Sequence, residues 1–232
     1  MRQIELEGVV LQRNKINDRD CYLRVFTRQM GKVDIFARGA NHPKNALNIG
    51  SSPFCYGLYQ VSGRKLQLRS VEVIDSFYDL RNDFSIMLMA SFFTKSYLYL
   101  FQEKQVSVEA FELIINSLSV LKKFPALKDK MLAYFLARII KIMGLMPDLD
   151  CVKRSTNGYM LQVEMGEAQE GGEDTEALLL WRDASNMKMS AFLNLSLDSK
   201  DLEKAARLME GFIYAHLGAD LPTLHQEMSE YL

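Results

Sequence analysis

The spacing of apolar residues changes near Phe77, and this change constrains the fold more than any other feature of the sequence. Before that residue, short runs alternate between apolar and polar positions, which is the period of strands buried on one side. After it, apolar residues recur with a period near 3.6, which is typical of amphipathic helices. The pattern therefore predicts a strand-rich N-terminal region followed by a mainly helical one.

The first eighty residues contain five strand-like runs, separated by turns and by one long loop at 38–52 that is rich in Gly, Asn, Pro and Ser. The expected strands lie near 9–13, 21–27, 33–37, 54–61 and 66–74. Five strands in so short a stretch are the size of a small closed barrel such as the OB-fold. We therefore expect an α+β protein with a five-stranded OB-fold β-barrel domain at 1–80.

The remainder, 81–232, is expected to form a mainly α-helical domain. Helices are expected near Phe84, from Ser107 as a cap to Lys123, from Pro125 to Gly144, and from about Ser199 to Leu217. The pattern is irregular at 158–181, and the stretch 164–176 holds six acidic residues and no basic one. We interpret it as an acidic, solvated loop inserted in the helical domain.

Charge is distributed unevenly along the chain, although the net charge is only −1. Residues 1–69 carry a net charge of +7, whereas residues 82–232 carry −6. A local positive field attracts polyanions whatever the total charge of the protein. The N-terminal third is therefore the candidate surface for a polyanion such as nucleic acid.

Secreted and membrane classes are not favoured. The three cysteines, Cys21, Cys55 and Cys151, are too few for a disulfide framework or a complete zinc site. The most apolar window spans 16 residues and contains Lys95, which is shorter than the roughly 20 residues needed to cross a bilayer. We expect a cytoplasmic protein with no membrane partner.

The sequence also offers no recognisable catalytic site. The three histidines, His42, His216 and His225, do not show paired metal-ligand spacing. A phosphate-binding G-x-x-x-x-G-K-[ST] loop and a G-x-S-x-G nucleophile elbow are both missing from the sequence. We therefore expect a protein that is not an enzyme and has no small-molecule substrate.

The binding signal lies in the second and third strands. Tyr22, Arg24 and Phe26 share the face opposite the aliphatic residues, and Arg38 lies on the corresponding face at the end of the third strand. Aromatic rings interleaved with cations are what single-stranded nucleic acid needs, because bases stack on rings and phosphates meet charges. The alternative is that Tyr22 and Phe26 pack against the helical half, with the arginines solvated at its edge; the pattern alone leaves both open. The predicted nucleic-acid-binding residues are Arg13, Lys15, Arg19, Tyr22, Arg24, Arg28, Lys32, Arg38 and Lys44.

An ordered set of short motifs runs through the chain. Its stronger members are Gly8–Leu11, Asp18–Arg28, Gly31–Lys32, Ala37–Ala40, Pro43–Lys44, Pro53–Phe54 and Gly63–Leu66, and its weaker ones are Met143–Cys151 and Tyr214–Gly218. In this order they resemble the RecO family of bacterial recombination-repair mediators. The resemblance spans most of the chain, and it too implies an N-terminal OB-fold followed by a helical domain.

The resemblance implies a function that composition does not. Such a protein would bind single- and double-stranded DNA, anneal complementary strands, and help load the RecA recombinase onto strands coated by single-strand-binding protein. The implied partners are RecR and the acidic C-terminal tail of single-strand-binding protein, and the implied location is the cytoplasm, at the nucleoid. The alternative is a protein-interaction adaptor whose OB-fold has lost significant DNA affinity, which the −6 charge of residues 82–232 keeps open.

The chain departs from the family at a zinc site that many relatives build from four cysteines. Cys151 stands where the first ligand would be, but Arg154 occupies the position of its partner. Glu173, Asp174 and Thr175 then stand in the region of the second cysteine pair. Because one thiolate cannot build a tetrahedral zinc site, we expect no zinc and no other cofactor.

Overall fold

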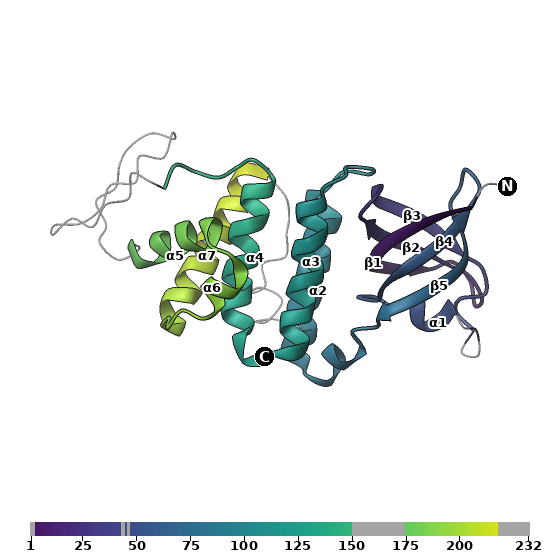
Figure 1. Cartoon of the computed structure of the whole chain (residues 1–232), viewed down its shortest axis with the longest axis horizontal. Coiled ribbons are helices and arrows are strands. Elements are labelled where there is room, and N and C mark those ends of the chain that lie inside the picture. The colour runs from purple at the N-terminus through teal and green to yellow at the C-terminus, as the bar shows by residue number, and fades with distance from the viewer. Residues whose placement is uncertain (1–2, 43–44, 46, 150–174, 218–232) are drawn as a thin grey trace. The chain divides into compact units, whose positions relative to one another are not determined.

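The computed structural model describes residues 3–42, 45, 47–149 and 175–217 (Figure 1). These residues divide into two compact units, one that ends at Lys123 and one that begins at Phe124. The first unit contains all the strands of the described chain, and the described part of the second is helical. The protein is therefore α+β, as predicted.

Five strands close into a barrel in the order β1-β2-β3-β5-β4 (Figure 1). They are β1 (Gln3–Lys15), β2 (Cys21–Thr27), β3 (Gly31–Ala37), β4 (Tyr56–Ser62) and β5 (Gln67–Asp75). The first part of β1 pairs with β4 and its second part with β2, and β5 joins β3 in parallel through Phe36 and Gln67. This arrangement confirms the predicted OB-fold. The first strand is longer than predicted, because one strand must reach two neighbours.

The alternation in β2 and β3 separates the inside of the barrel from the outside. Cys21, Leu23 and Val25 of β2 are fully buried, and so is Ile35 of β3, while Val33 is 5% exposed. Burying an aliphatic side chain of this size stabilises a fold by about 1.5–3 kcal/mol. The predicted inner face is confirmed.

The first unit also contains helical segments, and their caps follow the sequence. They are α1 (Leu47–Gly50), the 3₁₀ helix η1 (Tyr78–Asn82), α2 (Phe84–Leu100) and α3 (Val108–Lys123). The Asp83 carboxylate accepts bonds from the N–H groups of Ser85 and Ile86 at the start of α2. The Ser107 hydroxyl accepts a bond from the N–H of Ala110 at 3.2 Å, which confirms the predicted cap of α3.

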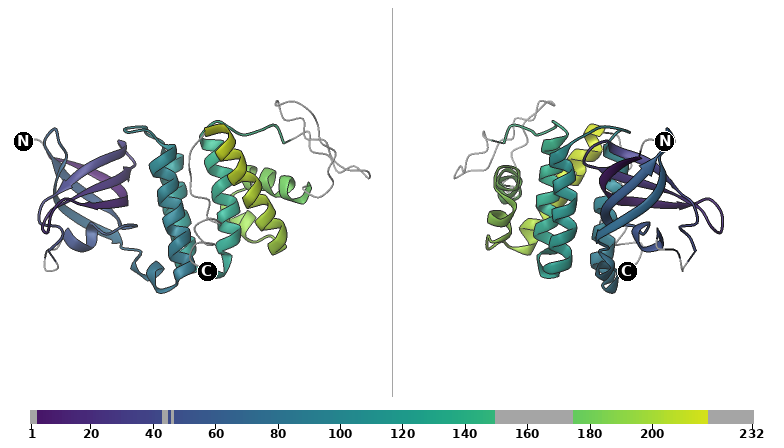
Figure 2. Two further views of the ribbon diagram at one scale, coloured as in Figure 1. Left: turned by 180° about the vertical axis from the view of Figure 1, so that it is seen from behind. Right: turned by 45° about the vertical axis from the view of Figure 1, so that its right-hand side comes forward.

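Helix α2 packs on the barrel. The Phe26 ring lies 4.9 Å from that of Tyr97 and 5.1 Å from that of Phe101, measured between centroids. Helix α3 runs beside α2 (Figure 2). By compactness, therefore, both helices belong with the barrel, and the two units differ from the predicted domains 1–80 and 81–232. The short helix α1 likewise lies inside the stretch 38–52 that we predicted to be loop throughout.

In the second unit the other helices pack around α4. The elements are the 3₁₀ helix η2 (Pro125–Leu127), α4 (Lys128–Ile142), α5 (Thr175–Asn186), α6 (Met189–Leu193) and α7 (Ser199–Leu217). Helix α4 is buried on several sides, as its apolar composition predicts, with Ala133, Phe135 and Ala137 fully buried. The chain leaves the helix at Gly144, whose φ of +73° suits a residue without a Cβ.

Helix α5 corrects the sequence prediction for 158–181, which we expected to be irregular. The helix begins at Thr175 and buries Leu178, Trp181 and Ala184. These residues recur every three positions, so they share one side of a helix and pack against α4 and α7. Residues 158–174 of the predicted acidic loop lie outside the described residues.

Within the described part of the chain, no helix combines the length and the apolar content needed to cross a membrane.

Candidate nucleic-acid interface

An accessible aromatic pair lies on the outward face of β2 and β3. Tyr22 is directly opposite Phe36 in the register of these strands, and their ring centroids are 5.4 Å apart. Tyr22 is 44% exposed, and Phe36 is half-buried. Asn14 of β1 is the other neighbour of Tyr22, and Gln67 of β5 is the other neighbour of Phe36. The rings therefore lie within a row that crosses four strands of the barrel.

The next pair along these two strands is ionic. Arg24 lies opposite Asp34 and donates to its two carboxylate oxygens, from Nε at 2.8 Å and from Nη2 at 2.9 Å. The hydrogen bonds with Asp34 raise the pKa of the Arg24 guanidinium above its usual value. Arg24 is thus on the predicted face, but its charge is already paired.

Exposed cations surround the aromatic end of this face, which we call the open end of β2–β3. Arg19 in the β1–β2 turn and Arg38 after β3 are both exposed. Lys15 is exposed as well, and it pairs with Asp18 at 3.0 Å. Asp20 orders these loops, because its Oδ1 accepts a bond from the N–H of Gly39 at 2.8 Å. That bond, followed by one from the Asn17 side chain, holds the pKa of Asp20 below its usual value.

Arg13, another predicted cation, has partners within the fold. Its Nη2 donates to the carbonyl oxygen of Ala40 at 2.9 Å and to Oδ1 of Asn41 at 2.7 Å. The side chain therefore fastens the loop after β3 to β1. Its donors are used within the fold, because a partly buried carbonyl oxygen needs a hydrogen-bond partner.

Two other predicted cations lie at the opposite end of β2 and β3, which we call the covered end. Lys32 is 6% exposed, and its Nζ donates to the Leu98 carbonyl oxygen of α2 at 2.5 Å. Burial lowers the pKa of Lys32. Arg28 donates to the Glu7 carboxylate at 2.7 Å and to that of Glu112 at 3.2 Å. Lys32 is therefore engaged by α2, and Arg28 by Glu7 of β1 and Glu112 of α3, so both predicted cations already have partners within the fold.

The two interpretations of the aromatic pattern differ in the surroundings that they require of Tyr22 and Phe26. Phe26 is fully buried against α2, as the structural alternative required. Tyr22 remains accessible, as the binding interpretation required. The structural alternative is therefore confirmed for Phe26 and not for Tyr22, and base stacking on Tyr22 stays a prediction. Lys44 lies outside the described residues.

The β4–β5 turn supplies cations that the sequence prediction missed. Arg64 and Lys65 are exposed and follow Gly63, whose φ is +81°. The turn lies beside the aromatic pair, because the N–H of Phe36 donates to the carbonyl oxygen of Leu66 at 2.8 Å. OB-folds bind ligands with the strand 2–3 face and with the loops between strands 1–2 and 4–5. The basic dipeptide after Gly63 was the signal that could have revealed this loop.

Cations of the second unit have a different environment. Lys130 of α4 donates to the carbonyl oxygens of Leu193 at 3.1 Å and Leu195 at 2.5 Å. Arg138 donates to the carbonyl oxygen of Ser185 at 2.9 Å. Cations at helix C-termini stabilise the carbonyl groups that have no partner in the helix. These two cations hold the helical unit together.

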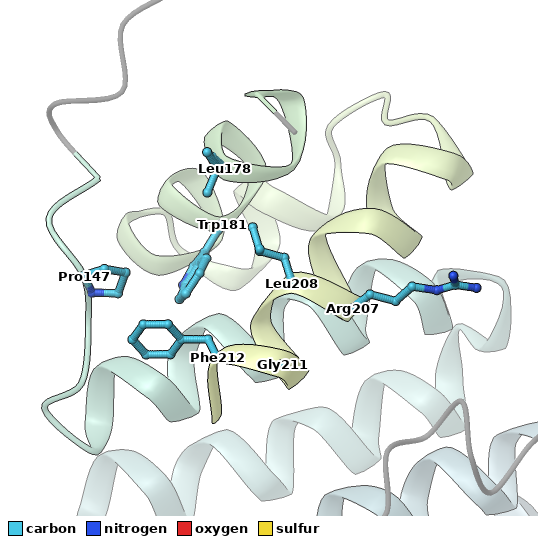
Figure 3. A pocket seen from close by; sticks show the side chains of 7 residues that line it. All are labelled: Pro147, Leu178, Trp181, Arg207, Leu208, Gly211 and Phe212. Carbon is cyan, nitrogen blue, oxygen red and sulfur yellow. The ribbon is translucent and has the colours of Figure 1, made fainter. Parts of the chain in front are cut away.

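A pocket of about 310 Å³ lies in the second unit, lined by residues of α5 and α7 and by Pro147 (Figure 3). The rings of Trp181 and Phe212 meet there edge to face at 5.1 Å. Arg207 is the charged residue of the lining; it pairs with Glu203, and its guanidinium points away from the rings. The pocket offers apolar contact and no group suited to acid–base or nucleophilic chemistry.

The described ranges contain no cluster of three or more His, Cys, Asp or Glu side chains arranged to hold a metal ion. Burial raises the pKa of the Cys55 thiol to about 11, so this cysteine is a poor nucleophile and ligand at neutral pH. Cys151 and Arg154, on which the expected loss of zinc depends, lie outside the described residues. The absence of zinc stays a prediction.

Comparison with known proteins covers most of the chain. The family model "Recombination protein O N terminal" matches residues 1–77, and "Recombination protein O C terminal" matches residues 81–225. Several curated relatives are named DNA repair protein RecO. That of Alkaliphilus metalliredigens is 29% identical over 169 residues, that of Acetivibrio thermocellus 28% over 156, and that of Bacillus pumilus 31% over 152. These alignments cover 70%, 66% and 64% of this chain, and 69%, 62% and 59% of the respective relatives.

Proposed function

The chain belongs to the RecO family of DNA repair proteins, and from this premise we propose that it is a DNA-binding mediator of recombinational repair. It binds single- and double-stranded DNA, anneals complementary strands, and helps load RecA onto strands coated by single-strand-binding protein. The observation that carries this proposal is the open end of β2–β3. There the exposed Tyr22 packs against the half-buried Phe36 on an OB-fold, beside the cations of three loops.

The open end supports binding through two physical effects. Exposed Arg19, Arg38, Arg64 and Lys65 neutralise phosphates, which releases condensed counterions and makes affinity depend on salt. Bases that leave a duplex stack on the Tyr22 ring, a contact that every base can make. Annealing by this route uses neither a catalytic residue nor a nucleotide cofactor, since the cations offset the repulsion between two phosphate backbones.

We propose as partners RecR and the acidic C-terminal tail of single-strand-binding protein, and as location the cytoplasm at the nucleoid. These follow from the family. The proposal includes no cofactor. Metal analysis of the purified, tag-free protein is expected to find no stoichiometric zinc, and a chelator is expected to leave its Tm unchanged. One tightly held zinc per chain would overturn this expectation.

A protein-interaction adaptor is the second candidate. It is favoured by the paired state of Arg24 and Arg28, which lowers the number of cations available to DNA. In such a protein the helical unit docks partners, and the barrel has lost significant DNA affinity.

Binding of the full-length protein to a fluorescein-labelled oligo-dT at 50 mM and 200 mM salt separates the two candidates. A mediator loses affinity steeply between these concentrations, with a log–log slope of about −0.7 for each neutralised phosphate. It also accelerates annealing of two complementary oligonucleotides in the same buffers. Weak binding that salt hardly changes, without annealing, would establish the adaptor instead.

A further inference from the structure

A carboxylate lies on the face that we propose for DNA. Asp34 is the one acidic residue in β3, and it is paired bidentately with Arg24 directly across from it in β2. A guanidinium binds phosphate with the same forked geometry. Asp34 therefore occupies the donors with which Arg24 would hold a phosphate.

The pair is accessible, and the neighbouring cation directs its hydrogen bond elsewhere. The side chains of Arg24 and Asp34 are 32% and 43% exposed. Lys32 lies two residues along β3, but it is buried and donates to the Leu98 carbonyl oxygen. Arg24 is therefore a cation that a DNA strand on this face can reach, in competition with the hydrogen-bonded Asp34 and, more weakly, with the charge of Glu103.

We propose that Asp34 restrains DNA binding by holding Arg24 in an ion pair that a phosphate must break. This inference rests on the proposed DNA-binding function of the same face. A phosphate that takes Arg24 leaves the Asp34 carboxylate unpaired and close to another anion, which offsets part of the attraction. A strand held in this way is released more readily to its complement, which suits annealing.

The test compares Asp34→Asn with the parent in the full-length protein, by titration of a fluorescein-labelled oligo-dT over a range of salt. The variant is expected to gain about one phosphate contact, which steepens the log–log slope by about 0.7. With equal affinities at 1 M salt, this difference in slope makes the variant bind about eightfold more tightly than the parent at 50 mM salt. Glu72→Gln is the matched control, since Glu72 is an exposed carboxylate on β5, opposite Leu58 of β4. It changes the net charge equally and is expected to bind within about twofold of the parent, because salt screens distant charges.

A second pair of variants tests whether Asp34 acts through Arg24. In the Arg24→Gln background, the Asp34→Asn change is expected to bring no gain in affinity. A gain that persists there, or a D34N variant that binds no tighter than E72Q, overturns the inference while leaving the proposed function intact. If neither the parent nor D34N binds with salt dependence, the proposed function fails and this inference with it. Should D34N fold poorly, judged from its Tm, Asp34→Thr removes the same charge with a residue that strands favour.

Discussion

The two ends of β2–β3 have similar outward residues but different environments. At the open end, Tyr22 packs against Phe36 and stays accessible, and Arg38 is exposed nearby. At the covered end, Phe26 and Lys32 are buried beneath α2. Both ends combine an aromatic ring with a cation. The comparison teaches that such a pattern is available to a ligand only where no other element of the fold packs on it.

The largest expected effect is a loss of stability in Phe26→Ala. The ring is fully buried against Tyr97 and Phe101, so its removal leaves a cavity. The free energy of unfolding is expected to fall by about 3–5 kcal/mol, measured by urea denaturation. DNA affinity of the folded fraction is expected to stay unchanged. A loss below about 1 kcal/mol would mean that the covered end is not packed as described.

The double variant Arg19→Ala/Arg38→Ala tests the open end. Two fewer phosphate contacts are expected to lower oligo-dT affinity on the order of 50-fold at 50 mM salt, and to reduce the slope by about 1.4. Both residues are exposed, so the Tm is expected to change little. Lys200→Ala/Lys204→Ala, which removes two exposed cations of α7, is the control. Equal losses in the two double variants would show that net charge, and not the open end, drives binding.

Tyr22→Ala separates stacking from charge at the open end. If a base stacks on the ring, the variant is expected to bind oligo-dT more weakly, by about 1–3 kcal/mol in binding free energy. Tyr22→Phe keeps a ring and is expected to bind like the parent. The salt slope is expected to be the same in all three proteins, because no cation is removed. A reduced Tm with unchanged affinity in Tyr22→Ala would instead assign the ring a purely structural role.

Lys32→Met is expected to have the smallest effect. The change removes a buried charge but leaves the Leu98 carbonyl oxygen without its donor, so the free energy of unfolding at pH 7 is expected to fall by about 1 kcal/mol. The salt slope of DNA binding is expected to be unchanged, since Lys32 is covered. If the slope falls as it does in the Arg19/Arg38 variant, the covered end takes part in binding after all.

The pH dependence sharpens this last test. Burial lowers the pKa of Lys32 in the folded state below its ordinary value of 10.5. Between the two pKa values the unfolded chain binds more protons, so this residue makes stability rise as the pH rises towards 10.5. Denaturation of the parent and of Lys32→Met over that pH range is expected to show that the free energy of unfolding rises less steeply with pH in the variant.

Local patterns in the sequence predicted much of the first unit. The period of two in 21–27 and 33–37 correctly assigned the inner face, because side chains of a strand alternate between the two sides of a sheet. The Ser107 cap of α3 was also correct, since a cap bonds to a group only three residues away. The sequence prediction missed helix α5, because the first residues of this helix belong to the acidic stretch that we interpreted as loop.

Contacts between distant parts of the chain could not be predicted in this way. Tyr22 and Phe26 are equivalent by alternation, yet one is 44% exposed and the other fully buried. The difference arises from α2, which begins more than fifty residues further along the chain and packs on one end of the strand only. Likewise, the β4–β5 turn lies beside the aromatic pair only because the barrel closes.

The sequence by itself therefore determined the α+β class, the OB-fold barrel and the residue types available for DNA, because these depend on local period and on composition. Only the tertiary structure decided which residues are accessible. It paired Arg24 with Asp34, used Arg13 and Lys32 to satisfy main-chain carbonyl groups, and left Arg38 exposed. The physical reason is that a side chain's exposure and charge state depend on neighbours in space, and these neighbours come from remote segments of the chain.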